Sequence, residues 1–541
     1  MITLLDYGAG NVRSVRNAIE ALGFTFRDVR GPDDIRHAER LIFPGVGAFG
    51  SAIQRLRADD YLEPLREYLH SGRPFLGICI GLQALFEGSE ESPDIPGLGI
   101  IPGWARRFPN DAMAVPQIGW NGIHPKKPSA LFADYRGEKL YFVHSYRAIP
   151  EPANEDWILA TTDYGSRFVS AVQRGNVAAV QFHPEKSGAA GLSILKNFLV
   201  ASDLSLSSSA DSQAAFLPAV PAQTKLAKRI IACLDVRAND EGDLVVTKGD
   251  QYDVRERADK GQGDRRVRNL GKPVDLAQRY YEEGADEITF LNITGFRDFP
   301  LADQPMLDVL RVTSERVFVP LTIGGGIREY TDAKGKHYSS LTVAAEYFRS
   351  GADKISIGSD AVHTVEELRR AGRASGESAI ERIAKVYGNQ AVVISIDPRR
   401  VYVHSPEQIP HYTIKTEFPG PNGEEYCWYQ CTVRGGREGR PVDARELAMA
   451  CEELGAGEIL LNCIDRDGTG RGFDLELIEL IHAAVSIPVI ASSGAGNVGH
   501  FSEVFAQTNV EAALAAGIFH RREVPIGDVK VRLRGEGVEI R

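Results

Sequence analysis

Cysteine, surplus positive charge and long apolar runs are all scarce in this sequence. The six cysteines among 541 residues follow no paired or ligand-like spacing, which excludes a disulfide framework and a structural zinc site. Acidic residues outnumber basic ones by 73 to 62, and the net charge of −11 argues against a nucleic-acid or anionic-membrane partner. No apolar run reaches the about 18 residues of a membrane span. A strand pattern begins at residue 2 with no basic leader before it, so we expect a cytoplasmic protein.

One segment, residues 201–225, differs in composition from the chain around it. It is rich in Ser, Ala and Pro, lacks strong periodicity, and follows a helical pattern. This composition predicts a linker between two domains, residues 1–200 and 226–541, although a long surface loop is an alternative. Both domains have sizes that are ordinary for α/β folds.

The second domain alternates short apolar runs with helical stretches. Runs of this length that end in Gly, Asp or Ser predict parallel strands covered on both faces. Eight such units predict a (β/α)₈ TIM barrel. The eight runs are residues 229–236, 287–293, 319–325, 353–359, 391–397, 458–464, 487–494 and 512–519.

The barrel sequence contains an internal repeat and two insertions. Residues 284–293 (GADEITFLNI) resemble residues 455–464 (GAGEILLNCI), as expected of two similar half-barrels. Polar insertions at 331–340 and 401–425 break the pattern, and their sequences indicate no function.

The first domain contains a Gly-x-Cys-x-Gly frame around Cys79, at the end of an apolar strand and before a helix. Glycines on both sides permit a sharp strand-to-helix turn, which exposes a nucleophile at a helix N-terminus. There the helix dipole favours the thiolate. A buried structural cysteine is the alternative, but the glycine frame favours a nucleophile.

A nucleophilic cysteine needs a base and a group that orients the base. His183 and Glu185 are separated by one proline, so both side chains can point the same way from an extended segment. Alone, this segment would be interpreted as an exposed turn. A glycine-rich turn after another apolar strand, formed by Gly45, Val46 and Gly47, can supply backbone N–H groups to an oxyanion.

Together these motifs resemble the class I glutamine amidotransferases over nearly the whole first domain. The similarity extends to Gln83 and to His144-Ser145-Tyr146, which resemble that family's glutamine-holding residues. The resemblance implies that Cys79 attacks the side-chain amide of glutamine and that His183 shuttles the proton. Ammonia and glutamate are the implied products.

The predicted strand ends of the barrel carry several aspartates. Asp235 and Asp397 occupy matching positions in the two halves, and two facing carboxylates suit acid–base chemistry. Asn292, Asp465 and Asp467 follow other strands. Each of the aspartates could instead cap the next helix. Lys248, in the first loop, could bind an anion or be merely solvated.

Two glycine-rich turns follow the third and seventh predicted strands of the barrel. Such turns let backbone N–H groups approach a phosphate at a helix N-terminus. Because the turns lie on opposite sides of a barrel, they imply a substrate with a phosphate at each end. Their residues include Gly325, Gly326, Ser492, Gly494 and Gly496.

The barrel sequence resembles the cyclase part of the imidazole glycerol phosphate synthases in LAKRIIACLDV, IGGGI, ISID and EILLNCIDRDGTGRGFD. The first domain, including PQIGWN, resembles that family's glutaminase. The similarity to the fused form implies conversion of a bis-phosphorylated imidazole ribonucleotide and ammonia to imidazole glycerol phosphate and AICAR. It makes Asp235 and Asp397 the acid/base pair, with Lys248 and Asp467 at the same mouth. Two positions depart from the resemblance: Asn292 stands where many single-subunit cyclases carry aspartate, and Ser493 replaces a glycine.

The resemblance also implies that the glutaminase docks on the amino-terminal face of the barrel and passes ammonia through it. A ring of charges is expected there, formed by Arg229, Glu287, Lys354 and Glu458. A structural ion-pair cluster is the alternative. Asp353 and Gln390 are candidates for contacting the glutaminase.

The sequence therefore predicts a glutamine-dependent cyclase of histidine biosynthesis that acts as a monomer and needs no metal or organic cofactor. An ammonia-using synthase of pyridoxal phosphate is a rival, but it needs lysines at strand ends, where this chain carries aspartates. A binding or regulatory protein that has lost its active sites is a second alternative. The simultaneous presence of Cys79, His183, Glu185, Asp235 and Asp397 argues against it.

Overall fold

The computed structural model describes residues 1–541 except 9, 112, 206–222, 240–242, 248–268 and 294–299. The predicted Lys248 and most of the predicted linker lie outside the described residues. Among the residues described, no helix is both long and apolar enough to cross a membrane.

The first part of the chain is built on an eight-stranded sheet in the order β2-β1-β3-β4-β13-β12-β11-β8. The strands from β2 to β13 are parallel, and β12, β11 and β8 continue the sheet antiparallel. In chain order they are β1 (Ile2–Leu4), β2 (Phe26–Asp28), β3 (Arg40–Phe43), β4 (Phe75–Ile78), β8 (His124–Pro125), β11 (Ile158–Tyr164), β12 (Ser166–Arg174) and β13 (Val177–Val180).

Helices cover both faces of this sheet, and each face has its own apolar core. One face packs against α1 (Val12–Ala21) and α6 (Gly188–Val200), the other against α3 (Phe49–Ala58) and α4 (Leu62–His70). The remaining elements are α2 (Pro32–Arg36), α5 (Ile80–Gln83), the sheet β5 (Phe86–Ser89), β6 (Ile101–Arg107) and β10 (Tyr146–Ala148), and the pair β7 (Gln117–Asn121) and β9 (Leu140–His144).

The second part of the chain closes into a parallel barrel, because its first strand pairs with its last as well as with its second. All eight predicted strands are confirmed. They are β14 (Arg229–Ala238), β16 (Glu287–Asn292), β17 (Leu321–Gly324), β20 (Lys354–Ile357), β21 (Val392–Ile396), β26 (Glu458–Asn462), β27 (Val489–Ser492) and β28 (Ala512–Ala515). The short β15 (Leu244–Thr247) extends the end of β14 antiparallel.

Helices surround this barrel, and their apolar faces pack on the outside of the strands. They are α8 (Pro273–Glu282), α9 (Pro305–Ser314), α10 (Ser340–Arg349), α11 (Ser359–Ala371), α12 (Ala379–Tyr387), α13 (Ala444–Glu453), α14 (Leu475–His482), α15 (Val498–Gln507), α16 (Gly517–His520) and α17 (Ile526–Gly535).

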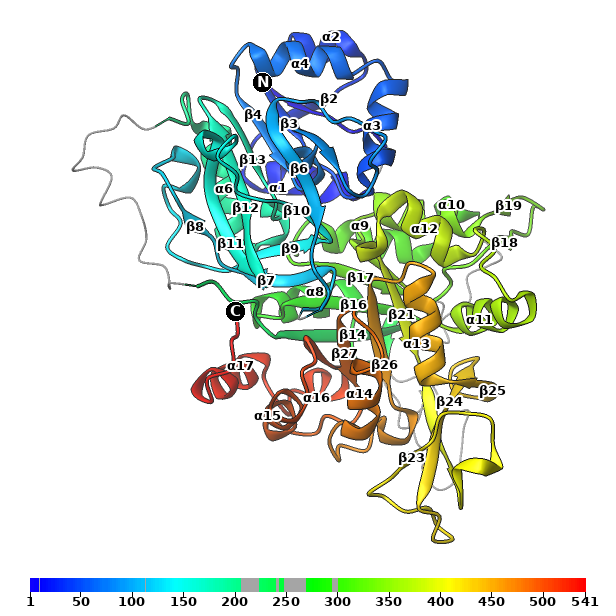
Figure 1. The fold of residues 1–541 in the computed structure, drawn as a ribbon. Helices are drawn as coiled ribbons and strands as arrows, with labels where there is room; N and C mark the ends of the chain where they lie inside the picture. Colours follow the sequence, from blue (N-terminus) through cyan, green and yellow to red (C-terminus); the bar gives the residue numbers. More distant parts are fainter. Residues whose placement is uncertain (9, 112, 206–222, 240–242, 248–268, 294–299) are drawn as a thin grey trace.

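The two insertions form small antiparallel sheets. The first is the hairpin of β18 (Tyr330–Thr331) and β19 (His337–Tyr338). The second contributes to a four-stranded sheet, which we call the insertion sheet: β22 (Pro398–Val403), β23 (Ile414–Lys415), β24 (Tyr426–Val433) and β25 (Glu438–Asp443). In Figure 1 this sheet projects from the barrel beside α13.

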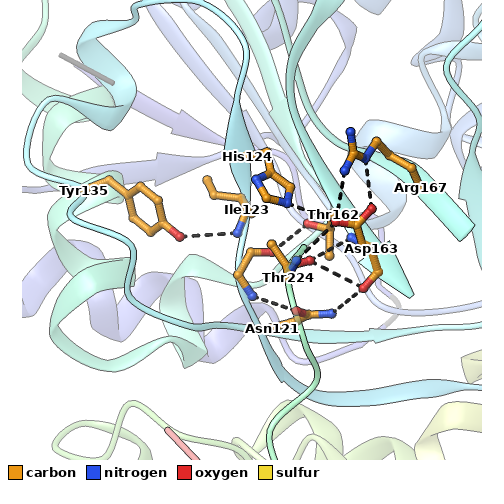
Figure 2. A network of polar contacts seen from close by, with 9 residues as sticks. Asn121, Ile123, His124, Tyr135, Thr162, Asp163, Arg167 and Thr224 are labelled. Carbon is orange, nitrogen blue, oxygen red and sulfur yellow. Dashed lines mark hydrogen bonds and ion pairs between the residues drawn. The ribbon is translucent and has the colours of Figure 1, made fainter. Parts of the chain in front are cut away.

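The chain rejoins the first domain at Thr224 before it enters the barrel. The Asp163 amide donates to Thr224 Oγ1 over 2.8 Å, and the Thr224 amide donates to Asp163 Oδ2 over 3.2 Å (Figure 2). Asp163 also binds Arg167 and His124, at 2.9 and 3.0 Å. This polar network fixes the chain against β11 only five residues before β14.

The first domain docks on the amino-terminal face of the barrel, as expected from the sequence (Figure 1). Trp120 is buried in the barrel's own apolar cluster and donates to the Asp286 carbonyl over 3.1 Å. Asp353, just before β20, accepts from Asn11 at 2.8 Å and pairs with Lys186 at 2.7 Å. Gln390, the other expected contact, donates to Tyr387 within the barrel.

Because Trp120 fills a buried site in a shared core, its truncation should destabilise both domains together. We expect Trp120→Ala to lower the free energy of unfolding by about 3–5 kcal/mol in urea denaturation. Trp104→Ala is the matched control, since Trp104 lies on β6 and is only part-buried, and should cost less. A loss below about 1 kcal/mol for Trp120→Ala would contradict a shared core.

Candidate active sites

Cys79 occupies a strained turn between β4 and α5. Its φ of 53° lies in the left-handed region, which a non-glycine residue rarely adopts. A Cβ atom at Gly81 would lie 2.1 Å from the Phe43 carbonyl oxygen, and one at Gly77 would lie 2.6 Å from the Gly81 carbonyl oxygen. Both glycines are therefore required for the turn to close, as the sequence frame predicted.

His183 and Glu185 form the expected pair beside Cys79. His183 Nδ1 lies 2.8 Å from Glu185 Oε1, and both side chains are buried. Burial alone would lower the pKa of His183, but the charges of Glu185 and Cys79 together raise that pKa well above its ordinary value. The arrangement favours an imidazolium that faces the sulfur. Gln181, which the sequence did not single out, donates to Cys79 Sγ over 3.4 Å.

The expected glutamine-holding residues converge near the elbow. Gln83 donates to the Tyr146 carbonyl over 2.9 Å and to Gln181 over 3.2 Å. Ser145 donates to Asn389 Oδ1 of the barrel over 2.9 Å, so this segment touches both domains.

Glu91 is a further acidic residue that sequence analysis missed. Burial raises its pKa to about 7, and its carboxylate accepts from the Phe49 amide over 2.7 Å. Its charge raises the pKa of Tyr146, after the larger effect of burial, so Glu91 lies near the glutamine-holding segment. A part-buried carboxylate at such a site is suited to a cationic ligand group.

The turn formed by Gly45, Val46 and Gly47 lies directly against the elbow. The Ile80 amide, which follows the nucleophile, donates to the Gly45 carbonyl over 3.4 Å. Tyr7 donates to the Val46 carbonyl, also over 3.4 Å. The Ala48 amide donates to the Val386 carbonyl of the barrel over 3.3 Å, which joins this turn to the second domain.

A cavity of about 840 Å³ occupies the carboxyl end of the barrel. It brings together the described residues that were expected to act on or bind the second substrate, together with Asn292 and Ser493. Asp465, another candidate at a strand end, does not line the cavity and accepts from the Arg400 amide instead. Lys248 lies outside the described residues. The assigned residues are Asp235, Asp397, Asp467, Gly325, Gly326, Ser492, Gly494 and Gly496. Arg434 and Arg437, from the turn between β24 and β25, also line the cavity and had no signal in the sequence.

Asp397 is held in the cavity wall by two neighbouring strands. Asn462 donates to its carboxylate over 2.8 Å, and Thr432 donates to its backbone carbonyl over 2.6 Å. Burial raises the pKa of Asp397 to about 6, and the nearby charge of Asp467 adds to the rise. A carboxyl group with this pKa can exchange a proton near neutral pH.

The glycine-rich turns of the barrel allow very close backbone approach. A Cβ atom at Gly325 would lie 2.1 Å from the Asn292 carbonyl oxygen, and one at Gly494 would lie 2.1 Å from the Gly472 carbonyl oxygen. Ser493 has a φ of 72°, a backbone conformation in which glycine is favoured, so its departure from the family pattern carries a strained backbone.

The four expected charges form one buried ring at the opposite end of the barrel. Arg229 pairs with Glu287 at 2.9 Å and with Glu458, while Lys354 pairs with both carboxylates at 2.6 Å. All four side chains are at most 1% exposed. Burial, and then the charge of Glu287, raise the pKa of Tyr141 from β9, and a Cβ atom at Gly119 of β7 would lie 3.6 Å from Arg229 Cδ. The first domain therefore lies against the ring.

One group of side chains in the described parts of the chain has the spacing of metal ligands: His411, Asp443 and Glu446. Asp443 already caps α13, and Glu446 already binds Arg369 through both oxygens. None of the three lines the cavity at the carboxyl end of the barrel, so we assign them no metal.

Comparison with known proteins separates the two domains in the same way. A family model of class-I glutamine amidotransferases matches residues 3–202, and one of histidine biosynthesis proteins matches residues 229–525. Over 542 residues the chain is 62% identical to the chloroplastic imidazole glycerol phosphate synthase hisHF of Arabidopsis thaliana, covering 100% of this chain and 89% of that protein.

A fungal relative matches the whole chain, and an archaeal relative matches a part of it. The imidazole glycerol phosphate synthase hisHF of Emericella nidulans is 55% identical over 100% of this chain and 98% of its own length. Subunit HisF of the synthase from Methanosphaera stadtmanae is 42% identical over 58% of this chain and 99% of its own length.

Glu185→Gln should reduce glutamate release from glutamine by roughly 10²- to 10⁴-fold, because His183 loses the carboxylate that orients and charges it. A coupled glutamate assay measures this effect. Glu63→Gln, an exposed substitution in the same domain, should change the rate less than twofold. Equal rates in both variants would contradict the role of Glu185.

Asp397→Asn should abolish the reaction in the barrel cavity. It should also raise the free energy of unfolding at neutral pH. The folded pKa of about 6 lies above the ordinary 3.8, so ionising Asp397 costs stability as pH rises between these values. Asparagine does not ionise, and the variant should gain up to about 3 kcal/mol above pH 6. Urea denaturation at pH 4 should show no gain. A gain that is equal at both pH values would contradict a raised pKa.

Proposed function

We propose, since the chain belongs to the family of fused imidazole glycerol phosphate synthases, that it releases ammonia from glutamine in its first domain and consumes it in its barrel. The barrel reaction converts a phosphoribulosyl-formimino imidazole carboxamide ribonucleotide to imidazole glycerol phosphate and AICAR, in histidine biosynthesis. The observation that supports this most strongly is that the two groups of expected site residues lie near opposite ends of one barrel.

In the first site, Cys79 attacks the side-chain carbonyl carbon of glutamine. His183 passes a proton to the leaving nitrogen, so ammonia departs and a glutamyl thioester remains. Water then hydrolyses the thioester to glutamate, with His183 as the base. Glu185 stabilises the charged imidazole, and the amides of the turn at Gly45, Val46 and Gly47 are proposed to bind the oxyanion.

Gln83, Ser145 and Tyr146 are proposed to hold glutamine, and Glu91 is proposed to meet its α-ammonium group. An ammonium ion beside Glu91 would favour the carboxylate form, which burial otherwise disfavours. Binding of glutamine would thereby offset the cost of ionising this part-buried carboxyl group.

In the second site, Asp235 and Asp397 are proposed to exchange protons with the substrate as ammonia adds and the ring closes. The turns at Gly325, Gly326 and at Ser492, Gly494, Gly496 are proposed to bind the two terminal phosphates through backbone N–H groups. Asp467 and Lys248 are proposed to bind at the same mouth, although Lys248 lies outside the described residues.

Ammonia is proposed to pass through the ring of Arg229, Glu287, Lys354 and Glu458, which must open transiently. The ring separates the two sites, and a path inside the barrel keeps ammonia unprotonated.

We further propose that residues 1–200 and 226–541 are the two catalytic domains, joined by residues 201–225. A monomer is proposed as the working unit, because the docked surfaces belong to one chain. The six cysteines all lie in the described parts of the chain and form no disulfide, which suits a reducing, cytoplasmic compartment.

The test is glutamate release with and without the bis-phosphorylated ribonucleotide, on the wild-type chain and Asp235→Asn. We expect the ribonucleotide to stimulate release strongly, and AICAR to form only with the wild type. Glutamate release that ignores the ribonucleotide, with no AICAR, would leave a glutaminase and contradict the cyclase assignment.

A further inference from the structure

Arg400 of the insertion sheet lies beneath a loop of the proposed cyclase site. It follows Asp397 by three residues, at the start of β22, and its side chain is only 5% exposed. The loop in question, residues 463–474, connects β26 to α14 and carries Asp467.

The guanidinium group of Arg400 is bound on several sides. Its Nε and Nη2 atoms donate to the two carboxylate oxygens of Asp474, at 2.9 and 2.6 Å. Nη2 also pairs with Glu476 at 2.8 Å, and Nη1 donates to Thr416 at 2.8 Å. The Arg400 backbone amide donates to Asp465 over 2.7 Å. Arg400 therefore binds the 463–474 loop at both ends.

Asp474, the main partner, is almost fully buried and caps the first turn of α14 through the Leu477 amide. Burial opposes its ionisation, but the hydrogen bonds from Arg400 more than compensate and lower its pKa. Tyr429 of β24 also donates to Asp474, over 3.1 Å. The loop end is thus held by a buried charge pair, in addition to the packing of Phe473 in the barrel core.

The other side of the same loop forms part of the substrate cavity. The Gly472 amide donates to the Gly494 carbonyl over 2.8 Å, which joins the loop to the glycine turn after β27. Asp467 is buried in the cavity wall, and its charge acts on Asp397. Displacement of the loop would move Asp467 away from Asp397 and also disturb the Gly494 turn.

We propose that Arg400 is a positioning residue for the barrel reaction, which holds the 463–474 loop so that Asp467 faces the cavity. This inference rests on the proposed function. It gives the insertion sheet a role that its sequence did not reveal. The sheet buries one cation under the site without adding Arg400 itself to the cavity lining.

The test uses the full chain and measures AICAR formation from the ribonucleotide with ammonium salt as the nitrogen source. We expect Arg400→Gln to lower kcat about 10- to 100-fold and to raise the KM for the ribonucleotide. Arg400→Lys, which keeps the charge, should recover part of the loss. Basal glutamate release without ribonucleotide should stay unchanged, because the first site lies on the other face of the barrel.

Arg440→Gln is the matched control. Arg440 belongs to the same insertion sheet and binds Glu366 through both oxygens, at 2.8 Å, but it does not contact the 463–474 loop. Its loss should leave kcat within twofold. Tyr429→Phe, which removes only the hydroxyl bound to Asp474, should cause a smaller loss and provides a test if Arg400→Gln does not fold.

A double-mutant cycle separates positioning from general destabilisation. If Arg400 acts through Asp467, the double variant Arg400→Gln/Asp467→Asn should be no slower than Asp467→Asn alone. Losses that multiply would overturn the inference, as would an Arg400→Gln enzyme as fast as Arg440→Gln. A wild-type chain that forms no AICAR would instead overturn the proposed function, and this inference with it.

Discussion

The buried ring of Arg229, Glu287, Lys354 and Glu458 sets the constraint on which the arrangement of the two sites depends. Two cations alternate with two carboxylates, so the ring is neutral, and every charge has partners of opposite sign. Loss of one member would leave an uncompensated buried charge, a change that typically costs about 3–5 kcal/mol. The burial of the ring therefore depends on the presence of all four charges.

The two proposed sites lie on opposite sides of this ring. The proposed glutaminase site adjoins the amino-terminal face, where Asp353 pairs with Lys186, and the substrate cavity opens at the carboxyl ends of the strands. Tyr141 connects them physically: its carbonyl accepts from the His183 amide over 2.9 Å, and its hydroxyl lies near the ring.

Much of this architecture was predictable from local sequence. The eight strands follow from short apolar runs, and the elbow at Cys79 follows from its two glycines, which the tight contacts of Gly77 and Gly81 require. The convergence of Asp235 and Asp397 in one cavity follows from their positions at strand ends in a closed barrel. The catalytic roles of these residues remain predictions.

Other features depend on contacts between distant residues and carried no local signal. Nothing in the sequence distinguishes Glu91 from the other acidic residues. Only burial in the folded chain raises its pKa. Arg400 directly precedes the polar insertion at 401–425, and only the folded chain brings it to Asp474, 74 positions later. The contact of Ser145 with Asn389 likewise joins two domains that the sequence treats separately.

The central claim is that ammonia made at Cys79 reaches the barrel site through the protein. Glutamine labelled with ¹⁵N in its side-chain amide would be supplied together with an excess of unlabelled ammonium, and the ¹⁵N content of the imidazole product would be measured by mass spectrometry. Internal passage predicts that nearly every product molecule keeps the label, whatever the ammonium concentration. A label that is diluted in proportion to the external ammonium would contradict the account.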